Sequence, residues 1–420
     1  MLSVTAPLGI GLLVGIGFGM LASLWGIGNP ETIIRTARLV DRLLLGCFLF
    51  VTALGAVLLY GLYAFGISMH FSPKPTYIYG VAAGGVLFGI GSAISGYFPG
   101  TALIALGEGR RDALAAIPGG LLGAAAWTAL FETPFGRWLA SAADLGDIVA
   151  GGDIKHISAP TMLLIAVIYA AVALGLLFFL PRYRGGDHCC LRDIGRTTAD
   201  EHDRRMASDT VAYLYEGVRP SPRPTWFERT TREQVAHPGF FARAISVIAV
   251  LVAVLVVASL FLRQQFGQST TYSWVVGELF MPSFAYTRQV ESSIGWEPLS
   301  DLGVLVGAFI AAYFISRRFT GFRPIVPPSW RNRFGPSQGK RAAAVFGGSF
   351  LTLFGARMAG GCTSGHTLSG GVQLSLSAWV FTASLLAAMF LTARLIYRDT
   401  SWLTVPEATP IDCHVNSPGS

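Results

Sequence analysis

The chain has 420 residues, of which 52% are hydrophobic and only 13% are charged, and its mean hydropathy is +0.53. A soluble protein carries nearly twice this share of charged residues. The composition therefore excludes an ordinary soluble enzyme or binding module and indicates an integral membrane protein. The formal net charge of +7 would also suit a nucleic-acid ligand, so the positions of the basic residues have to be considered.

Apolar blocks recur along the chain, each long enough to cross a bilayer as a helix, which takes about 20 residues. The first block lacks a basic leader region and a small-residue cleavage pattern, which favours a retained span over a signal peptide. We expect an all-α integral membrane protein with about nine transmembrane helices. The blocks lie at 7–25, 43–67, 78–96, 112–131, 160–181, 241–263, 301–316, 342–359 and 374–393.

The basic residues are unevenly distributed between the two sides that these spans define. Most of the 31 Lys and Arg fall on one side, in segments 26–42, 107–112, 182–243 and 317–341 and in the C-terminal tail. Because basic loops resist translocation, this side is expected to be cytoplasmic. The pattern predicts a multi-pass protein of the plasma (inner) membrane, with its N-terminus outside and its C-terminus inside. It also explains the net charge without a nucleic-acid partner.

One long polar stretch, rich in Arg, Asp, Thr and Pro, interrupts the apolar blocks. It lacks a spanning segment, so we interpret it as a linker between two membrane halves. The predicted organisation is an N-terminal transmembrane half at 1–181, a polar cytoplasmic linker at 182–240, a C-terminal transmembrane half at 241–397 and a cytoplasmic tail at 398–420.

The two halves contain related glycine-rich motifs. GIGSAISGYFPGT (89–101) aligns with LFGARMAGGCTSG (353–365), so that Gly91 corresponds to Gly355 and Gly96 to Gly360. Each motif ends an apolar span with residues that continue a helix poorly. In the predicted topology the third and eighth spans run in opposite directions, which makes the repeat inverted.

Interrupted segments at corresponding positions of two inverted halves indicate a transport site near the membrane midplane. A broken helix exposes backbone groups that a substrate or water must satisfy, and the N–H groups at a helix start favour an anion. We therefore expect an anion path between two broken or re-entrant segments that meet at the centre. The first motif would contribute Gly96, Tyr97, Phe98, Pro99, Gly100 and Thr101, and the second Gly360, Gly361, Cys362, Thr363, Ser364 and His366.

The motifs also carry a resemblance. GARMAGGCTSGH resembles the signature of the YeeE/YedE family of sulfur-compound transport proteins, and SGYFPGTALIALGEG is similar to an earlier family motif that has Cys where this chain has Phe98. A third stretch, GFGMLASLWGIGNPETI (17–33), is similar to another family segment. The resemblance covers roughly residues 8–131 and 240–396 and leaves out the 182–239 linker.

The resemblance implies a compact helical membrane protein with inverted halves that moves thiosulfate or a related sulfur anion inward. Cys362 matches a family cysteine taken to contact the passing substrate through its thiol, whereas Phe98 breaks the match in the first half. Cys47, in the second span, supplies a second thiol only if it faces the same axis. Neither a cofactor nor a metal is expected, and the absence of HExxH, GxSxG and Walker motifs argues against an enzyme.

Several residues keep a second interpretation. The glycines can simply allow close helix packing. His366 is a hydrogen-bond donor to the anion or a proton carrier, or else a neutral side chain bonded to a backbone carbonyl. Arg357 binds the anion or pairs with carbonyls exposed by the broken helix. Cys189 and Cys190, in the linker, are ordinary reduced thiols or contact sulfur at the exit side.

Two functions remain open at this point. The first is a permease or channel-like facilitator for a small sulfur anion, with the lipid bilayer as its surroundings. The second is a membrane sulfur-handling protein that passes persulfide sulfur through its cysteines to a cytoplasmic sulfur-accepting partner.

Overall fold

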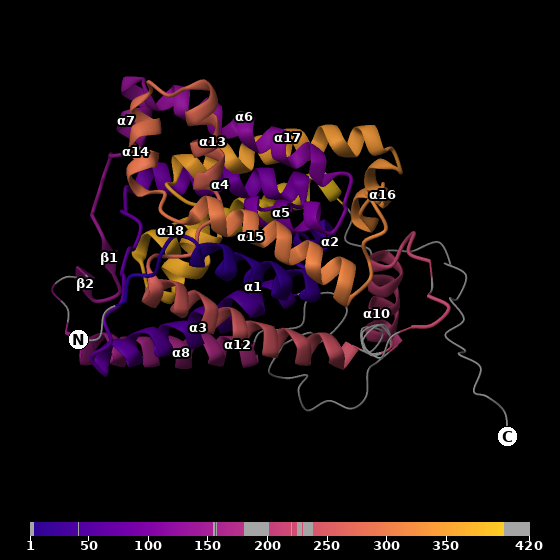
Figure 1. Ribbon diagram of the computed structural model, residues 1–420, viewed down its shortest axis with the longest axis horizontal. Helices are drawn as coiled ribbons and strands as arrows, with labels where there is room; N and C mark the ends of the chain where they lie inside the picture. The colour runs from indigo at the N-terminus through magenta and orange to yellow at the C-terminus, as the bar shows by residue number, and fades with distance from the viewer. Residues whose placement is uncertain are drawn as a thin grey trace.

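The computed structural model describes residues 4–40, 42–153, 156, 158–179, 201–219, 221–224, 229 and 238–398. Within these ranges the protein is mainly helical, and its only sheet is a hairpin of β1 (Ile148–Val149) and β2 (Gly152–Asp153). The long helices run side by side across the molecule (Figure 1). The predicted all-α membrane fold is confirmed.

Eight helices precede the polar linker and most of the others follow it. The first half contains α1 (Ile10–Trp25), α2 (Pro30–Ala37), α3 (Leu43–Ala64), α4 (Ile78–Ser95), α5 (Pro99–Gly107), α6 (Ala113–Phe131), α7 (Pro134–Leu139) and α8 (Ala159–Phe179). The linker contributes α10 (Glu201–Leu214). The second half contains α12 (Pro238–Leu262), α13 (Thr270–Phe280), α14 (Ala285–Ser293), α15 (Glu297–Ile310), the π-helix η1 (Ala311–Ile315), α16 (Pro328–Phe334), α17 (Gln338–Met358), the π-helix η2 (Ser364–Gly370) and α18 (Leu376–Tyr397).

The expected number of nine spans is not confirmed. In the described part of the chain, six helical stretches are long and apolar enough to cross a membrane, or up to seven if α1 and α2 form one bent span. These two helices meet at an angle of 67°. The apolar stretch described in α12, Ser246–Leu262, is shorter than a full span, and α17 carries the buried Arg341 and Arg357 among its apolar residues.

Apolar side chains cover the outer surfaces of the bundle, as expected where helices face lipid. Exposed examples on α8 are Leu164, Val167, Ile168, Val172 and Leu176. The buried core, by contrast, contains many small residues that let the helices approach closely.

The inverted repeat is visible in the contacts between α4 and α17. Gly84 lies against the backbone of Gly355, and Gly91 lies against the backbone of Gly348. In the motif alignment Gly91 corresponds to Gly355, so Gly84, seven residues earlier, corresponds to Gly348. The two contacts are therefore the same contact with the halves exchanged. A Cβ atom at any of these four positions would collide with the opposite backbone.

A second helix pair repeats this reciprocity. Gly15 and Gly19 of α1 lie against the α15 backbone, and Gly303 and Gly307 of α15 lie against the α1 backbone. Both pairs join a helix of the first half to a helix of the second. The halves are thus interleaved, and the centre of the molecule is built from both.

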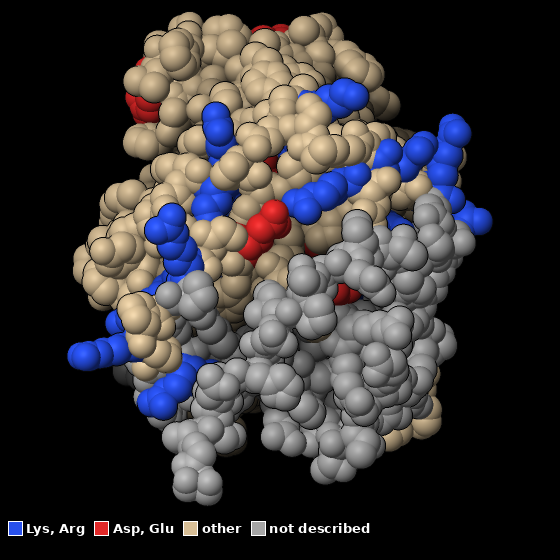
Figure 2. Space-filling model, turned by 90° about the vertical axis from the view of Figure 1, so that its right-hand side faces the viewer, with Lys and Arg blue, Asp and Glu red and all other residues tan. Residues whose placement is uncertain are grey.

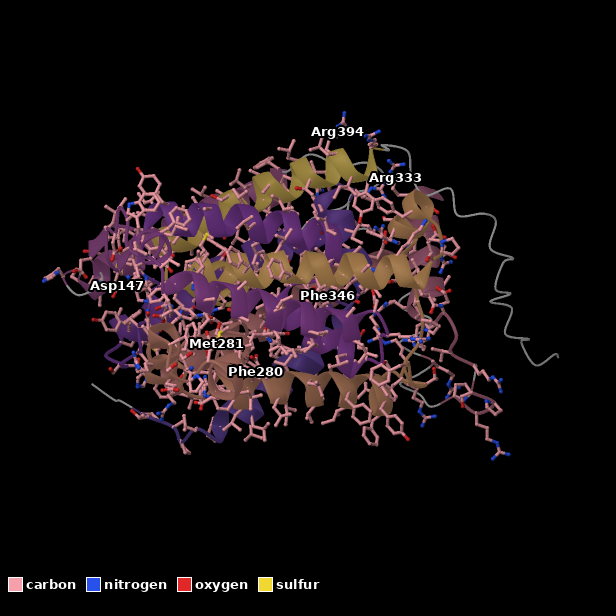
Figure 3. The ribbon with its side chains drawn as sticks, turned by 90° about the horizontal axis from the view of Figure 1, so that it is seen from above. Asp147, Phe280, Met281, Arg333, Phe346 and Arg394 are labelled. Atoms are coloured by element: carbon pink, nitrogen blue, oxygen red, sulfur yellow. The ribbon has the colours of Figure 1, made fainter. Side chains whose placement is uncertain are left out.

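The two ends of the bundle differ in composition. One end, called here the α14 end, carries α7, α13, α14 and the β-hairpin, and the opposite α16 end carries α10 and α16 (Figure 1). Lys and Arg side chains gather on the α16 end (Figure 2). Arg333 and Arg394 lie toward this end, and Asp147 lies at the opposite end (Figure 3). Exposed basic residues of the α16 end include Arg111, Arg317, Arg331, Arg333 and Lys340.

The linker helix α10 packs against the α16 end. Tyr213 is buried there, and its hydroxyl accepts a hydrogen bond of 3.0 Å from Nη1 of Arg110. Arg35 of α2 donates to the Thr210 hydroxyl at 3.3 Å. The assignment of 182–240 as a linker and 398–420 as a tail falls largely outside the described residues.

Candidate functional site

The first motif breaks the chain between α4 and α5. Gly96 ends α4 in the left-handed conformation, with φ of 71°, which a residue with a side chain adopts at a cost. Pro99 then begins α5 at the first helical position, where its missing N–H removes no hydrogen bond. Between them Phe98 is extended, and its N–H donates to the Thr101 hydroxyl at 2.8 Å.

The second motif breaks the chain between α17 and η2. Gly360 is also left-handed, with φ of 79°, and a Cβ atom there would collide with the Tyr77 hydroxyl. Both the backbone conformation and the lack of space therefore require glycine at this position. The chain then passes through Cys362 into the π-helix η2, and short π-helical segments are frequent at functional sites.

Cys362 is buried, with 2% of its surface exposed, and its Sγ lies 3.0 Å from the Ser364 hydroxyl. A basic side chain from a distant loop lies beside it. The Cε atom of Lys74 is 3.6 Å from where a Cβ atom would stand on Gly361, and 4.0 Å from that position on Gly365. The absence of side chains at these two glycines leaves room for the Lys74 chain.

Lys74 comes from the loop between α3 and α4. Its Nζ donates to the Gln265 side-chain oxygen at 3.0 Å, when that amide is oriented so that its nitrogen donates to the Ser72 carbonyl. Burial lowers the pKa of Lys74, an effect that the nearby Glu297 opposes and Arg357 reinforces. A partly desolvated ammonium group beside a buried thiol is suited to attract a small anion.

Arg357 binds hydroxyl groups, not carbonyls. Its Nε and Nη2 donate to the Tyr286 hydroxyl at 3.0 and 2.8 Å, and its Nη1 donates to the Ser269 and Thr270 hydroxyls at 3.1 and 3.2 Å. Glu297 acts on the same segment, since its Oε1 accepts from the backbone N–H groups of Ser269 and Thr270 at 2.8 and 2.5 Å. Arg357 and Glu297 thus hold the beginning of α13 from two sides.

His366 is fully buried beneath this region. Its Nε2 lies 2.9 Å from the Ala359 carbonyl, and since a carbonyl only accepts, Nε2 carries the proton. Nδ1 has no hydrogen-bond partner among the described residues. The ring also stacks on Phe381, with a centroid distance of 4.7 Å.

The segment that begins α13 reaches both breaks. The Tyr272 hydroxyl donates to the Pro99 carbonyl at 3.4 Å, and Tyr272 is electrostatically coupled to Cys362. A side chain on Gly100 would collide with Gln268, so the start of α5 also contacts this segment. Cys362 and the Pro99–Gly100 turn therefore share a neighbour, which the sequence alone did not predict.

Tyr97 lies in a different environment. Its hydroxyl donates to Asp112 at 2.8 Å, and the same carboxylate accepts from Nε of Arg341 at 3.0 Å. Arg341 also lies over the Tyr97 ring. The Tyr97 hydroxyl is therefore engaged by a buried ion pair between the first half and the start of α17.

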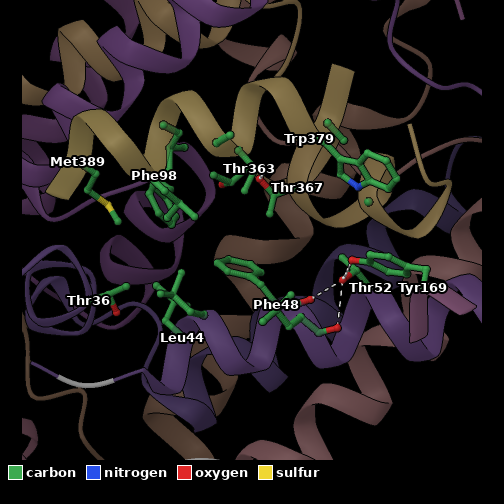
Figure 4. Close-up of a pocket in the computed structure, with 18 residues that line it drawn as sticks. Thr36, Leu44, Phe48, Thr52, Phe98, Tyr169, Thr363, Thr367, Trp379 and Met389 are labelled. Atoms are coloured by element: carbon green, nitrogen blue, oxygen red, sulfur yellow. Dashed lines mark hydrogen bonds between the residues drawn. The ribbon is translucent and has the colours of Figure 1, made fainter. Parts of the chain in front are cut away.

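Phe98 and Thr363 line a common cavity of about 470 Å³ (Figure 4). Its other walls come from α2, α3, α8, η2 and α18 and are mostly apolar. The exceptions are threonines such as Thr367 of η2 and Thr52 of α3, whose hydroxyl bonds to Tyr169 at 2.8 Å. Such walls suit hydrocarbon better than a divalent anion. Cys47 is buried on α3 but is not among the residues that line this cavity.

Several central residues were not predicted as site residues: Lys74, Gln265, Tyr272, Glu297 and Asp301. Glu297 and Asp301 offered a usable signal, because two carboxyls four residues apart at the start of an apolar block are unusual in a membrane. Cys189 and Cys190, the linker cysteines, lie outside the described residues.

Comparison with known proteins identifies the group to which this chain is related. Residues 33–391 match the family described as sulphur transport, a range that includes both motifs and runs across the linker. The chain is also 24% identical over 400 residues to a protein named thiosulfate transporter TsuA from Spirochaeta thermophila, an alignment that covers 92% of this chain and 98% of that protein. The chain therefore belongs to the sulphur transport (YeeE/YedE) family of multi-pass membrane proteins.

Proposed function

We propose that this protein carries thiosulfate or a related small sulfur-containing anion inward across the plasma membrane, as a permease or channel-like facilitator. The anion would pass along a central path between the two glycine-rich breaks. The observation that carries the proposal is the position of Lys74, whose side chain lies over Gly361 and Gly365 beside the buried Cys362 thiol.

The chemistry of these groups suits a sulfur anion. The Lys74 ammonium supplies positive charge where water is scarce and screening is therefore weak. The Cys362 thiol and the Ser364 hydroxyl lie 3.0 Å apart, and both can donate a hydrogen bond to a passing anion. A thiol is a weak donor, so it would bind the anion loosely and release it readily. The resemblance to a thiosulfate transporter of similar length supports the choice of substrate.

The distribution of charge supports an orientation. Basic side chains gather on the α16 end (Figure 2), which would make this end cytoplasmic and the α14 end external. Lys74 and Cys362 would then face the anion as it arrives. The Gly96–Thr101 break would form the inner part of the path, with Phe98 beside it as a gate or as packing.

The direct test is uptake of radiolabelled thiosulfate into proteoliposomes, with sulfate, sulfite and selenite as competitors. We expect Cys362→Ser to reduce uptake and the Cys189→Ser/Cys190→Ser double variant to leave it largely intact. Cys47→Ser is the matched variant, because it removes the other buried cysteine of the described chain.

The opposite pattern would contradict the proposal. If Cys362→Ser takes up thiosulfate normally while the linker double variant does not, the path does not use the second motif as described. Mass spectrometry of protein exposed to thiosulfate separates the persulfide relay, since sulfur added to a cysteine without uptake would support that alternative.

A further inference from the structure

Helix α15 carries two carboxyl groups one turn apart, and they differ in their surroundings. Glu297 is engaged with the backbone N–H groups that begin α13. Asp301 is buried, with 4% of its surface exposed, and neither of its carboxylate oxygens has a hydrogen bond from a described residue. The Thr271 hydroxyl faces Asp301, but the geometry of the pair falls short of a hydrogen bond.

The helices packed against α15 supply no positive charge to Asp301. Neither α1 (IGLLVGIGFGMLASLW) nor α5 (PGTALIALG) contains a titratable residue, and η1 contains only the half-exposed Tyr313. Tyr272 faces Asp301 from α13, and Glu297 faces it from its own helix. No Lys or Arg of the described chain lies within ion-pair distance of Asp301.

An ionised Asp301 would therefore be desolvated and unpaired, with a second carboxyl one turn away. Burial of an unpaired charge is strongly unfavourable, so the neutral acid is the form that this packing accommodates. A structural carboxyl in the same protein looks different: Asp112 is also buried, but it bonds to Tyr97 and Arg341. Asp301 makes no such bonds, and its presence in α15 is not explained by stability.

Asp301 is also connected to the path. Tyr272 is electrostatically coupled to both Asp301 and Cys362, and its hydroxyl bonds to the Pro99 carbonyl of the first break. Glu297, the neighbour of Asp301 on α15, interacts electrostatically with Lys74. An anion that arrives beside Lys74 would therefore change the field at Glu297, the carboxyl that acts on Asp301.

We propose that Asp301 is a proton-carrying site that couples anion influx to proton influx, an inference that rests on the proposed function. A proton from the external water forms an O–H bond with one Asp301 oxygen while the anion occupies the path. This bond breaks when the proton is released to water on the inner side. Nothing else is consumed, and one proton accompanying one divalent anion carries a single negative charge inward.

The test uses purified protein in proteoliposomes that contain a pH-sensitive dye, with the membrane potential clamped at zero. For the wild type, inward movement of thiosulfate should acidify the lumen. An external pH one unit below the internal pH should raise steady-state accumulation about tenfold if one proton is coupled to each anion.

Three variants give the result its specificity. Asp301→Asn should still exchange labelled for unlabelled thiosulfate across the membrane but should lose both the acidification and the response to the pH gradient. Asp301→Glu keeps a titratable group and should retain part of the coupling. Glu291→Gln, which removes an exposed carboxyl of α14, should behave as the wild type.

The outcomes that contradict the inference are distinct from failure of the proposed function. Thiosulfate uptake by the wild type without acidification, uptake driven by a sodium gradient instead, or full coupling in Asp301→Asn would each overturn it. The first two measurements need only the wild-type protein, so they stand even if Asp301→Asn does not fold. Absence of any sulfur-anion uptake would instead refute the proposed function, and the inference with it.

Discussion

Replacing Lys74 by Met should weaken anion binding while preserving the length of the side chain. In the structure the Lys74 side chain lies beside Gly361, where an anion would approach, and its ammonium group donates to the reoriented Gln265 amide at 3.0 Å. A hydrogen bond to a charged group contributes about 2 kcal/mol, which corresponds to about a 30-fold rise in KM for thiosulfate. The measurement is the concentration dependence of initial uptake in proteoliposomes.

Two control variants and the pH dependence make this prediction specific. Lys74→Arg keeps the charge and should retain most of the affinity, and Lys340→Met removes an exposed lysine of the α16 end and should change nothing. Burial lowers the pKa of Lys74, and the cation is the form that binds. Affinity should therefore be complete below that pKa and fall as the pH rises through it. Lys74→Arg should lose this dependence of KM, since Arg stays charged. An unchanged KM in Lys74→Met would refute the reasoning.

Three further outcomes are expected. Gly360→Ala should lower the free energy of unfolding of the detergent-solubilised protein by at least about 1–2 kcal/mol, the cost of a left-handed residue with a side chain, and so lower its melting temperature. Gly339→Ala is the control, because Gly339 is exposed and has open space around it, and it should not lower the melting temperature. Phe98→Cys should change the uptake rate or the competition by other sulfur anions, and identical uptake and selectivity would leave Phe98 as packing. Tyr213→Phe removes the hydrogen bond from Arg110, so hydrogen exchange in α10 should become about fivefold faster, and equal exchange would show that this bond does not hold the helix.

The ends of the broken helices could be predicted from the sequence with little error. The expected blocks 78–96 and 342–359 correspond to α4 (Ile78–Ser95) and α17 (Gln338–Met358). The reason is local, because Gly96 and Gly360 take a backbone conformation that ends a helix. The short helices α13 and α14 were not predicted, since α13 has only 11 residues and α14 is polar. The start of α13 and the Tyr286 side chain of α14 are instead joined by the contacts of Arg357.

The candidate site was predictable only where it lies within a motif. Cys362 was identified because a recognisable run of glycines surrounds it. Lys74 was not predicted as a site residue, and nothing in its local sequence indicates that it reaches Gly361 across almost 290 residues. The partners of Arg357 are likewise hydroxyls from two short helices elsewhere in the chain. Contacts of this kind depend on how the two halves pack, and that packing cannot be deduced from local patterns in a single sequence.

The reciprocal glycine contacts between α4 and α17 have a consequence for the origin of this architecture. In an isologous interface between identical subunits, each contact occurs twice, with the two partners exchanged. Gly84 against Gly355 and Gly91 against Gly348 are thus the contacts that two copies of one ancestral half, inserted in opposite directions, would make as a dimer. Within one chain, however, the two halves need not stay identical. Cys362 in one half and Phe98 in the other occupy corresponding positions of the two motifs, so the halves differ there.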